Sequence, residues 1–283
     1  MHLGNARTAL LAWLQARAAG GRIALRIEDL DRDRCRPAWV EPLRDDLHWL
    51  GLDWDLEQQR QSERGALYDA ALERLAAAGA VYECFCTRAE VRAASAPHGP
   101  EPVYPGTCRD LTDAERAARR AAGRRAALRL RVPSEQIAFD DLVHGPQSVD
   151  VAAGGDFVVR RADGLHAYQL AVVVDDGELG VTHVLRGDDL LSSTPRQILL
   201  QRLLGLPTPV YAHVPLMRAA GGERLAKRHA AATVQAIREA GRPAAGLVGE
   251  LAASVGLAEP GEALAPADLV DRFRGATLRG WAS

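Results

Sequence analysis

After Met1 the chain reads His2-Leu3-Gly4-Asn5-Ala6-Arg7-Thr8-Ala9-Leu10 and continues directly into a predicted helix. Apolar side chains at helical spacing indicate a helix over Asn5 to Ala19, with Asn5 as its N-cap and Gly20-Gly21 as its end. A glycine in front of a helix lets a phosphate approach the backbone, and the N-terminal N–H groups and the helix dipole favour an anion. His2 can donate a hydrogen bond to a phosphate oxygen. Alone, this stretch is a weak indication of a nucleotide site, because any turn before a helix can carry a glycine.

Lysine is nearly absent from the chain. Of its 35 basic side chains, one is a lysine, Lys227, in Glu223-Arg224-Leu225-Ala226-Lys227-Arg228. Arginine therefore serves wherever only positive charge is needed, and a lone lysine indicates a site that requires a compact ammonium on a flexible stem. Binding a nucleotide phosphate as a point charge is such a task. On composition alone, a surface lysine kept by chance remains the alternative.

Composition and charge limit the class of protein. A length of 283 residues allows one large core or two domains, and 47 % hydrophobic with 25 % charged residues is typical of globular proteins. The net charge of −2 excludes a general basic field, so an RNA contact would need a local patch. No apolar run reaches the roughly 18–20 residues of a membrane span, and no signal peptide is recognisable. Four cysteines are too few and too unevenly spaced for a disulfide scaffold. A cytoplasmic enzyme without a membrane segment is expected.

The first eighty residues predict a parallel α/β layer. A short strand over Ile23–Ile27 leads into the acidic turn Glu28-Asp29-Leu30-Asp31, and two helices follow over Pro37–Leu50 and Leu67–Ala78. From Tyr82 the character of the sequence changes, because cysteines and a Pro/Gly stretch appear. This change predicts an inserted region over 81–165.

Within the insertion, we expect a helix over Asp113–Arg125 and strands over Leu128–Val132 and Phe157–Arg160. After it, the run Ala171-Val172-Val173-Val174-Asp175-Asp176 has the pattern of a buried parallel strand. Val181–Leu185 repeats that pattern. We expect a helix to begin at Ser193-Thr194-Pro195 and to run through Leu204, and an Ala-rich helical tail after Ala230.

Four blocks follow one another along the chain. The first is the opening block, and the second is Leu25-Arg26-Ile27-Glu28-Asp29-Leu30-Asp31. The third is Arg186-Gly187-Asp188-Asp189-Leu190-Leu191-Ser192-Ser193-Thr194-Pro195, and the fourth is Arg224-Leu225-Ala226-Lys227-Arg228. Together they resemble the class I glutamyl-tRNA synthetase family along nearly the whole chain. The first block is similar to the HIGH signature in its form ending in Asn. The last is similar to the KMSKS signature, although Arg224 and Ala226 depart from its usual Lys and Ser. Lys227 occupies the second lysine position, which in the family is credited with stabilising the transferring phosphates.

The resemblance implies an α/β fold of the class I aminoacyl-tRNA synthetase type. Residues 1–80 would form the first half of a Rossmann-type parallel sheet, and 81–165 a zinc-bearing insertion. Residues 166–230 would form the second half with the KMSKS-like loop, and 231–283 a short helical tail. The family carries an Arg-Phe-Ala-Pro-Ser-Pro-Thr-Gly strand and loop just before the first block, whereas here Met1 precedes His2. We expect a misplaced start to explain that missing N-terminal strand.

The resemblance also implies a set of site residues. His2, Gly4, Asn5 and Lys227 would bind ATP, which would enter as a substrate with Mg²⁺, and His2 and Lys227 would be catalytic. For the substrate glutamate, Glu28 would receive the amino group, Tyr168 would line the pocket, and Arg186 would pair with the side-chain carboxylate. A planar guanidinium suits that last task because it can form two parallel hydrogen bonds with a carboxylate. Without the resemblance, a solvated acid after a strand remains the interpretation of Glu28.

The cysteines separate two branches of the family. Cys84-Phe85-Cys86, Tyr104 and Cys108 resemble the Cys-x-Cys…Tyr-x-x-x-Cys zinc site of a shorter branch, which attaches glutamate to the queuosine base of tRNA(Asp). Three thiolates and a phenolate can fill one structural, tetrahedral zinc site per chain, although a phenolate is an unusual ligand. From spacing alone, three unlinked core cysteines remain the alternative. Cys35 lies outside the pattern.

The shorter branch implies glutamate, ATP and the anticodon stem-loop of tRNA(Asp) as partners, and a monomer with no protein partner. Two alternatives stay open. One is a truncated or discriminating enzyme that charges a tRNA 3′ end, and the other is a decayed, non-catalytic module that binds nucleotide or RNA. Seven arginines between Arg116 and Arg131 fit either a solvated helix face or a phosphate-binding patch.

Overall fold

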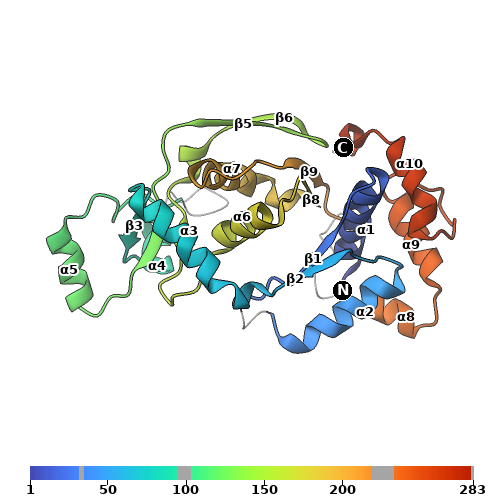
Figure 1. Cartoon of the computed structure of the whole chain (residues 1–283), viewed down its shortest axis with the longest axis horizontal. Helices are drawn as coiled ribbons and strands as arrows, with labels where there is room; N and C mark the ends of the chain where they lie inside the picture. Colours follow the sequence, from blue (N-terminus) through green and yellow to red (C-terminus); the bar gives the residue numbers. More distant parts are fainter. Residues whose placement is uncertain (32–34, 95–102, 218–232, 282–283) are drawn as a thin grey trace.

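The computed structural model describes residues 1–31, 35–94, 103–217 and 233–281 as a mixed α/β protein (Figure 1). Its helices are α1 Leu3–Ala18, α2 Val40–Trp49, α3 Gly65–Ala77, α4 Arg88–Ala94, α5 Asp113–Ala121, α6 Tyr168–Leu179, α7 Thr194–Leu203, α8 Val234–Glu239, α9 Ala244–Ala253 and α10 Val270–Arg274. Its strands are β1 Ala24–Arg26, β2 Leu56–Gln58, β3 Val81–Cys84, β4 Ala127–Leu130, β5 Gln136–Asp141, β6 Gly145–Asp150, β7 Val158–Arg160, β8 His183–Gly187 and β9 Val210–Val214.

The strands form three sheets. β1 and β2 pair in parallel, and so do β8 and β9. β9 also meets β5 through the parallel pair Tyr211 and Asp141, and β5 and β6 form an antiparallel hairpin, so this sheet has the order β6-β5-β9-β8. β3, β4 and β7 form a separate antiparallel sheet in the insertion. The predicted parallel α/β fold is thus confirmed, although β5 and β6, which fall within residues 81–165, join the sheet of β8 and β9.

Helix α1 links the two parallel sheets to the C-terminal helices. Leu10 and Leu14 are buried in one core with Leu185 of β8, Val214 of β9 and residues of α9 and α10. The helix begins earlier than its sequence indicated: Leu3 is its first residue, and His2 rather than Asn5 is the N-cap. The Nδ1 atom of His2 accepts a hydrogen bond from the Asn5 backbone N–H at 3.3 Å. The prediction of Asn5 as N-cap was therefore wrong by one helical turn.

The run Ala171–Asp176 is helical, so the prediction of a strand there was wrong. It forms the middle of α6, which ends at Gly180 in the left-handed conformation with φ +66°. Residues Leu170 to Val173 are all buried, and an apolar run buried on several sides reads the same in a helix as in a buried strand. Packing against α3 and α7 has overridden the strand preference of three consecutive valines.

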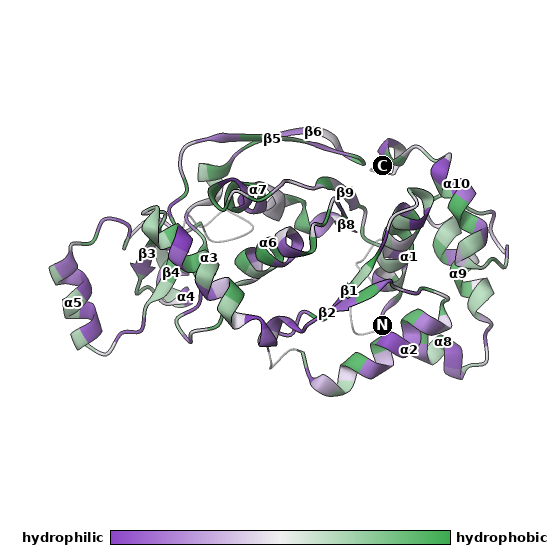
Figure 2. Cartoon of the chain, in the orientation of Figure 1, coloured by the Kyte–Doolittle hydropathy of each residue, from purple (hydrophilic) through white to green (hydrophobic). Residues whose placement is uncertain are grey.

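The other predicted elements are confirmed with shifted ends. The helix expected to reach Arg125 stops at Ala121, with Gly123 at φ +75° just beyond it. The hairpin β5–β6 and strand β9 were not predicted. Figure 2 shows that α5, which buries none of its residues, is largely hydrophilic. Within the part of the chain that the structure describes, no helix is long and apolar enough to cross a bilayer.

Candidate active site and metal centre

The opening block lies at the N-terminus of α1, beside both ends of an undescribed segment. A Cβ added to Gly4 would come within 3.2 Å of the His2 ring and 3.9 Å of the Met217 Cβ atom, so both side chains lie close to the backbone at Gly4. Thr233 forms a β-bridge with His2, and the Val234 N–H donates to the Met1 carbonyl at 2.8 Å. Met217 and Thr233 flank residues 218–232. Lys227, with Arg224 and Ala226, lies in that segment, outside the described residues.

Glu28 follows β1 and is held by a neighbour on that strand. Arg26 donates from Nη2 to Glu28 Oε1 at 2.9 Å, and from Nη1 to Asp176 Oδ1 on α6 at 2.6 Å. Burial raises the pKa of the Asp176 carboxyl, although the guanidinium of Arg26 opposes that effect. The side chain of Glu28 remains 39 % exposed, so its carboxylate stays open to a ligand.

Tyr168, the first residue of α6, is close enough to Glu28 and Arg186 for both charges to act on its phenol. Burial raises the pKa of its phenol, the negative charge of Glu28 raises it further, and Arg186 acts in the opposite direction. The structure therefore brings together Glu28, Tyr168 and Arg186, which are far apart in the sequence.

Arg186, on β8, is a buried cation without a carboxylate partner in the described chain. It is 8 % exposed and forms no ion pair with any described Asp or Glu within 4.0 Å. Its Nε donates to His213 Nε2 at 3.0 Å, and its Nη2 donates to Thr194 Oγ1 at 2.9 Å and to Gln197 Oε1 at 2.7 Å. Nη1 is thus the nitrogen left for a ligand. A buried charge is costly unless a counter-charge meets it, so an incoming carboxylate would be favoured.

A second buried network, centred on Asp175, also fixes α6. Asp175 is fully buried and accepts from Arg64 Nε at 2.8 Å, from Gln61 Nε2 at 2.8 Å and from the Tyr68 hydroxyl at 2.9 Å. These contacts tie α6 to α3 and to the turn before it. They position the neighbouring Asp176, and with it Arg26 and Glu28.

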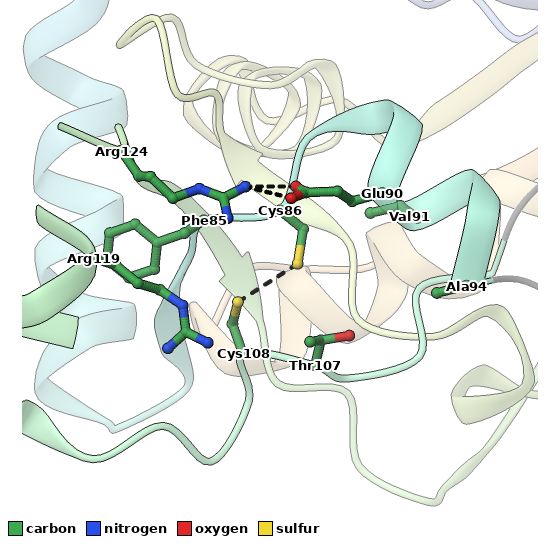
Figure 3. Close-up of a pocket in the computed structure, with 9 residues that line it drawn as sticks. All are labelled: Phe85, Cys86, Glu90, Val91, Ala94, Thr107, Cys108, Arg119 and Arg124. Carbon is green, nitrogen blue, oxygen red and sulfur yellow. Dashed lines mark hydrogen bonds and ion pairs between the residues drawn. The ribbon is translucent and has the colours of Figure 1, made fainter. Parts of the chain in front are cut away.

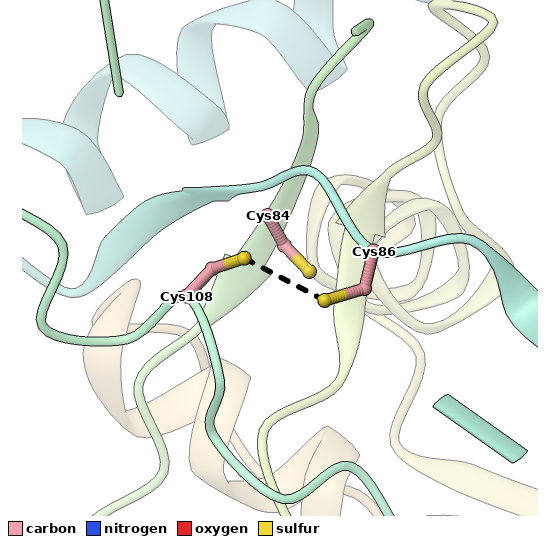
Figure 4. Close-up of side chains that lie close together, drawn as sticks. All are labelled: Cys84, Cys86 and Cys108. Carbon is pink, nitrogen blue, oxygen red and sulfur yellow. Dashed lines mark hydrogen bonds between the residues drawn. The ribbon is translucent and has the colours of Figure 1, made fainter. Parts of the chain in front are cut away.

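Three thiols converge in the insertion (Figure 4). The Sγ atoms of Cys84, Cys86 and Cys108 all lie within 4.8 Å of one another, and those of Cys86 and Cys108 are 3.6 Å apart. Sulfurs bound to one tetrahedral zinc at about 2.3 Å are separated by about 3.8 Å, so this spacing fits a metal ion. The predicted cluster of three thiols is confirmed. Cys35 stays outside it, with its Sγ 3.3 Å from the Glu28 carbonyl oxygen.

The hydroxyl of Tyr104 faces the same cluster. Its oxygen accepts from the Cys108 backbone N–H at 2.7 Å and lies 3.4 Å from Cys84 Sγ. The guanidinium of Arg129 lies 3.8 Å from the centre of the Tyr104 ring. Burial raises the pKa of the Cys86 thiol to about 12 when no metal is present. A divalent cation would reverse that effect, because it stabilises thiolates.

A cavity of 270 Å³ opens beside the thiols (Figure 3). On its wall Arg124 forms an ion pair with Glu90 at 2.6 Å, and Arg119 stands nearby, with no ion pair to a described residue. Most of the arginines between Arg116 and Arg131 have partners inside the insertion: Arg116 with Asp113, Arg120 with Glu83, Arg124 with Glu90, Arg129 with the Asp156 carbonyl and Arg131 with Asp110. These contacts favour the solvated-face interpretation for this group.

A family model described as tRNA synthetases class I (E and Q), catalytic domain, matches residues 1–259. The chain belongs to this family. It is 56 % identical to a glutamyl-Q tRNA(Asp) synthetase of Symbiobacterium thermophilum over 96 % of this chain and 88 % of that protein. It is 51 % identical to one of Nitratidesulfovibrio vulgaris over 98 % and 90 %. Among solved structures, a glutamate-tRNA synthetase of Elizabethkingia anophelis matches with a TM-score of 0.83 at 27 % identity, covering 95 % of this chain and 62 % of that one.

Several residues that shape the site of this class I synthetase were not predicted from the sequence. Arg26, Asp176, Asp141, His213 and Gln197 all lie within one or two contacts of Glu28 or Arg186. One signal was available: an imidazole, His213, stands inside the buried run Tyr211-Ala212-His213-Val214. A buried histidine in such a strand requires hydrogen-bond partners.

Proposed function

We propose that this class I synthetase activates glutamate with ATP and transfers it to the queuosine base of tRNA(Asp). Support comes from relatives bearing that name at 56 % and 51 % identity over nearly the full length of the chain. The observation that carries the amino-acid assignment is Arg186, a buried guanidinium that faces no carboxylate of the described chain.

In this proposal three residues hold glutamate. The side-chain carboxylate of the substrate meets Nη1 of Arg186 and supplies the missing counter-charge. The carboxylate of Glu28, oriented by Arg26, receives the substrate ammonium group. Tyr168 forms the wall between them. Opposite charges at the two ends of the pocket match the opposite charges at the two ends of glutamate.

The nucleotide binds at the N-terminus of α1. A glutamate α-carboxylate oxygen attacks the α-phosphorus of ATP, the bond to the bridging oxygen of the β-phosphate breaks, and pyrophosphate leaves with that electron pair. His2, Gly4 and Asn5 offer donors and close backbone approach there. Lys227 would neutralise phosphate charge as it develops, and Mg²⁺ would accompany the nucleotide. In the second step a hydroxyl of the RNA attacks the activated carbonyl and AMP leaves. Catalysis is mostly positioning and charge stabilisation.

The insertion has a structural role in the proposal. Cys84, Cys86, Tyr104 and Cys108 would hold one zinc ion, which would fix the ends of β3 and the loop before α5. The same proposal divides the chain into a catalytic domain at 1–80 and 166–230, an insertion at 81–165 and a tail at 231–283. It also includes a monomeric state and a cytoplasmic location.

Glutamate-dependent exchange of label between pyrophosphate and ATP tests the activation step. Purified protein should catalyse exchange with glutamate and much less with glutamine, because glutamine carries no charge for Arg186. If no amino acid supports exchange, with or without tRNA, the decayed binding module would be favoured instead.

A further inference from the structure

We propose that Asp141 and His213 are positioning residues that fix the guanidinium of Arg186 so that Nη1 is presented to the glutamate side chain. The inference rests on the proposed function, and it assigns a role to two buried residues that touch neither substrate nor nucleotide in it.

The pair is rigid because both side chains are buried and the carboxylate is hydrogen-bonded through both of its oxygens. Asp141 and His213 are both fully buried, and His213 Nδ1 lies 2.6 Å from Asp141 Oδ2. The other carboxylate oxygen, Oδ1, accepts from the backbone N–H groups of Val143 at 3.0 Å, His144 at 2.9 Å and His213 itself at 3.3 Å. The carboxylate of Asp141 is thus anchored by the β5–β6 turn and by β9.

The chemistry of Arg186 fixes the tautomer of His213. A guanidinium can only donate, so His213 Nε2, 3.0 Å from Arg186 Nε, must accept. Its single ring proton therefore sits on Nδ1 and is donated to Asp141. Burial lowers the pKa of His213, which keeps the ring neutral, although the charge of Asp141 opposes this. Burial alone would raise the pKa of Asp141, but hydrogen bonds from His213 and the backbone hold it at about 2.

A second arm holds the other edge of the guanidinium. Thr194 and Gln197 both accept from Arg186 Nη2, and Gln197 Nε2 donates to Gln169 Oε1 at 2.9 Å. Gln169 adjoins Tyr168 on α6. With Nε held by His213 and Nη2 held by this arm, the plane of the guanidinium is fixed and Nη1 alone remains for a ligand. Preorganisation of this kind lowers the cost of binding a carboxylate in one orientation.

Two substitutions at His213 separate positioning from packing. In His213→Gln the side-chain oxygen can occupy the place of Nε2 and still accept from Arg186. In His213→Asn the amide reaches only the place of Nδ1, so the contact with Asp141 is kept and the contact with Arg186 is lost. Asp141→Asn is a third, nearly isosteric variant. Its Oδ1 keeps the backbone donors, so its amide N–H₂ faces His213 Nδ1 and forces the ring proton onto Nε2, against the donor Arg186 Nε.

Steady-state pyrophosphate exchange gives the readout, with melting temperature measured in parallel. We expect His213→Asn and Asp141→Asn to raise the glutamate KM roughly tenfold or more, since one hydrogen bond to a charged group is lost, with ATP KM unchanged. Exchange with glutamine should stay at its wild-type level, so the preference for glutamate over glutamine falls. His213→Gln should keep the glutamate KM within about threefold. The control His183→Asn makes the same substitution at an exposed histidine of β8, the strand that carries Arg186, and should alter nothing.

The proposal is overturned if His213→Asn and Asp141→Asn keep the wild-type glutamate KM. It is equally overturned if all three variants change glutamate and glutamine exchange alike in proportion to lost stability, because a purely structural role predicts that. Failure of wild-type protein to exchange with glutamate would instead contradict the proposed function itself.

Discussion

At the scale of single residues, the site is an arrangement of charges completed by a substrate. Glu28 is oriented by Arg26, which is itself tied to Asp176, whereas Arg186 is held by neutral acceptors. Resemblance supplied Glu28, Tyr168 and Arg186 from the sequence. It could not supply Arg26 and Asp176, because their contact joins positions 150 residues apart and arises only when α6 packs beside β1.

Lys227 tests most directly the role that its position as the one lysine of the chain indicates. Lys227→Ala should lower kcat for glutamate activation by roughly 10²-fold or more with little change in ATP KM, since its charge acts on the developing phosphate charge. Lys227→Arg should restore little activity, because a planar fork cannot follow the phosphate as an ammonium does. Pyrophosphate exchange measures both variants, and full activity in the arginine variant would refute the argument.

His213 also predicts a pH dependence of stability. Its pKa in the folded protein is below the usual value of about 6.5, so below that pH the unfolded chain binds a proton that the native chain does not. Its stabilising contribution is therefore complete above pH 6.5 and is lost as the pH falls, by up to about 1.4 kcal/mol per pH unit. Urea unfolding between pH 5 and 7 gives the free energy of unfolding at each pH, and this free energy should rise less steeply with pH in His213→Gln than in wild type. An equal rise in both proteins would mean that the pKa of His213 is the same in the folded and the unfolded chain.

At the scale of elements, α6 carries much of the site and was the element predicted wrongly. Its apolar run reads as a buried strand, and only the tertiary contacts decide for a helix. Asp175 and Asp176, which end the apolar run, form part of the predicted strand pattern. In the structure they accept hydrogen bonds from Arg64 and Arg26. The C-terminal end of α1 and the position of strand β8 were predicted more closely, because Gly20 marks the end of the helix and an apolar run marks the strand.

Asp175 should be the strongest anchor of α6. Asp175→Ala would leave the guanidinium of Arg64, whose side chain is 4 % exposed, without its buried partner. Removal of one partner of a buried pair costs about 3–5 kcal/mol, so the melting temperature should fall by several degrees. Asp175→Asn, which can still accept one of the hydrogen bonds, should lose less. Calorimetry compares the two, and equal melting of Asp175→Ala and wild type would contradict an anchoring role.

The thiol cluster predicts metal-dependent stability of the insertion. Protein purified without chelator should contain about one equivalent of zinc, and Cys86→Ser should lose it together with part of the thermal stability. Cys35→Ser is the matched control, because that thiol lies outside the cluster. Elemental analysis and melting curves give the readout. Metal-free protein that melts like the metal-containing form would exclude a structural metal.

At the scale of the whole molecule, three hydrophobic clusters correspond to different parts of the chain. One joins α1 to the C-terminal helices, a second surrounds α6 and α7, and a small third one contains Cys84, Tyr104 and Cys108 in the insertion. The hairpin β5–β6, which carries Asp141, escaped prediction because its sequence alternates weakly and is partly polar.

The acceptor of the glutamyl group is the central claim, and paired tRNA samples test it most directly. Labelled glutamate should be transferred to tRNA(Asp) that contains queuosine and not to the same tRNA made without it, nor to tRNA(Glu). The reason is that the proposed acceptor is a hydroxyl of the modified base, which only the first sample carries. Equal transfer to tRNA(Asp) with and without queuosine, or transfer to tRNA(Glu) alone, would contradict the account and favour an enzyme that charges a 3′ end.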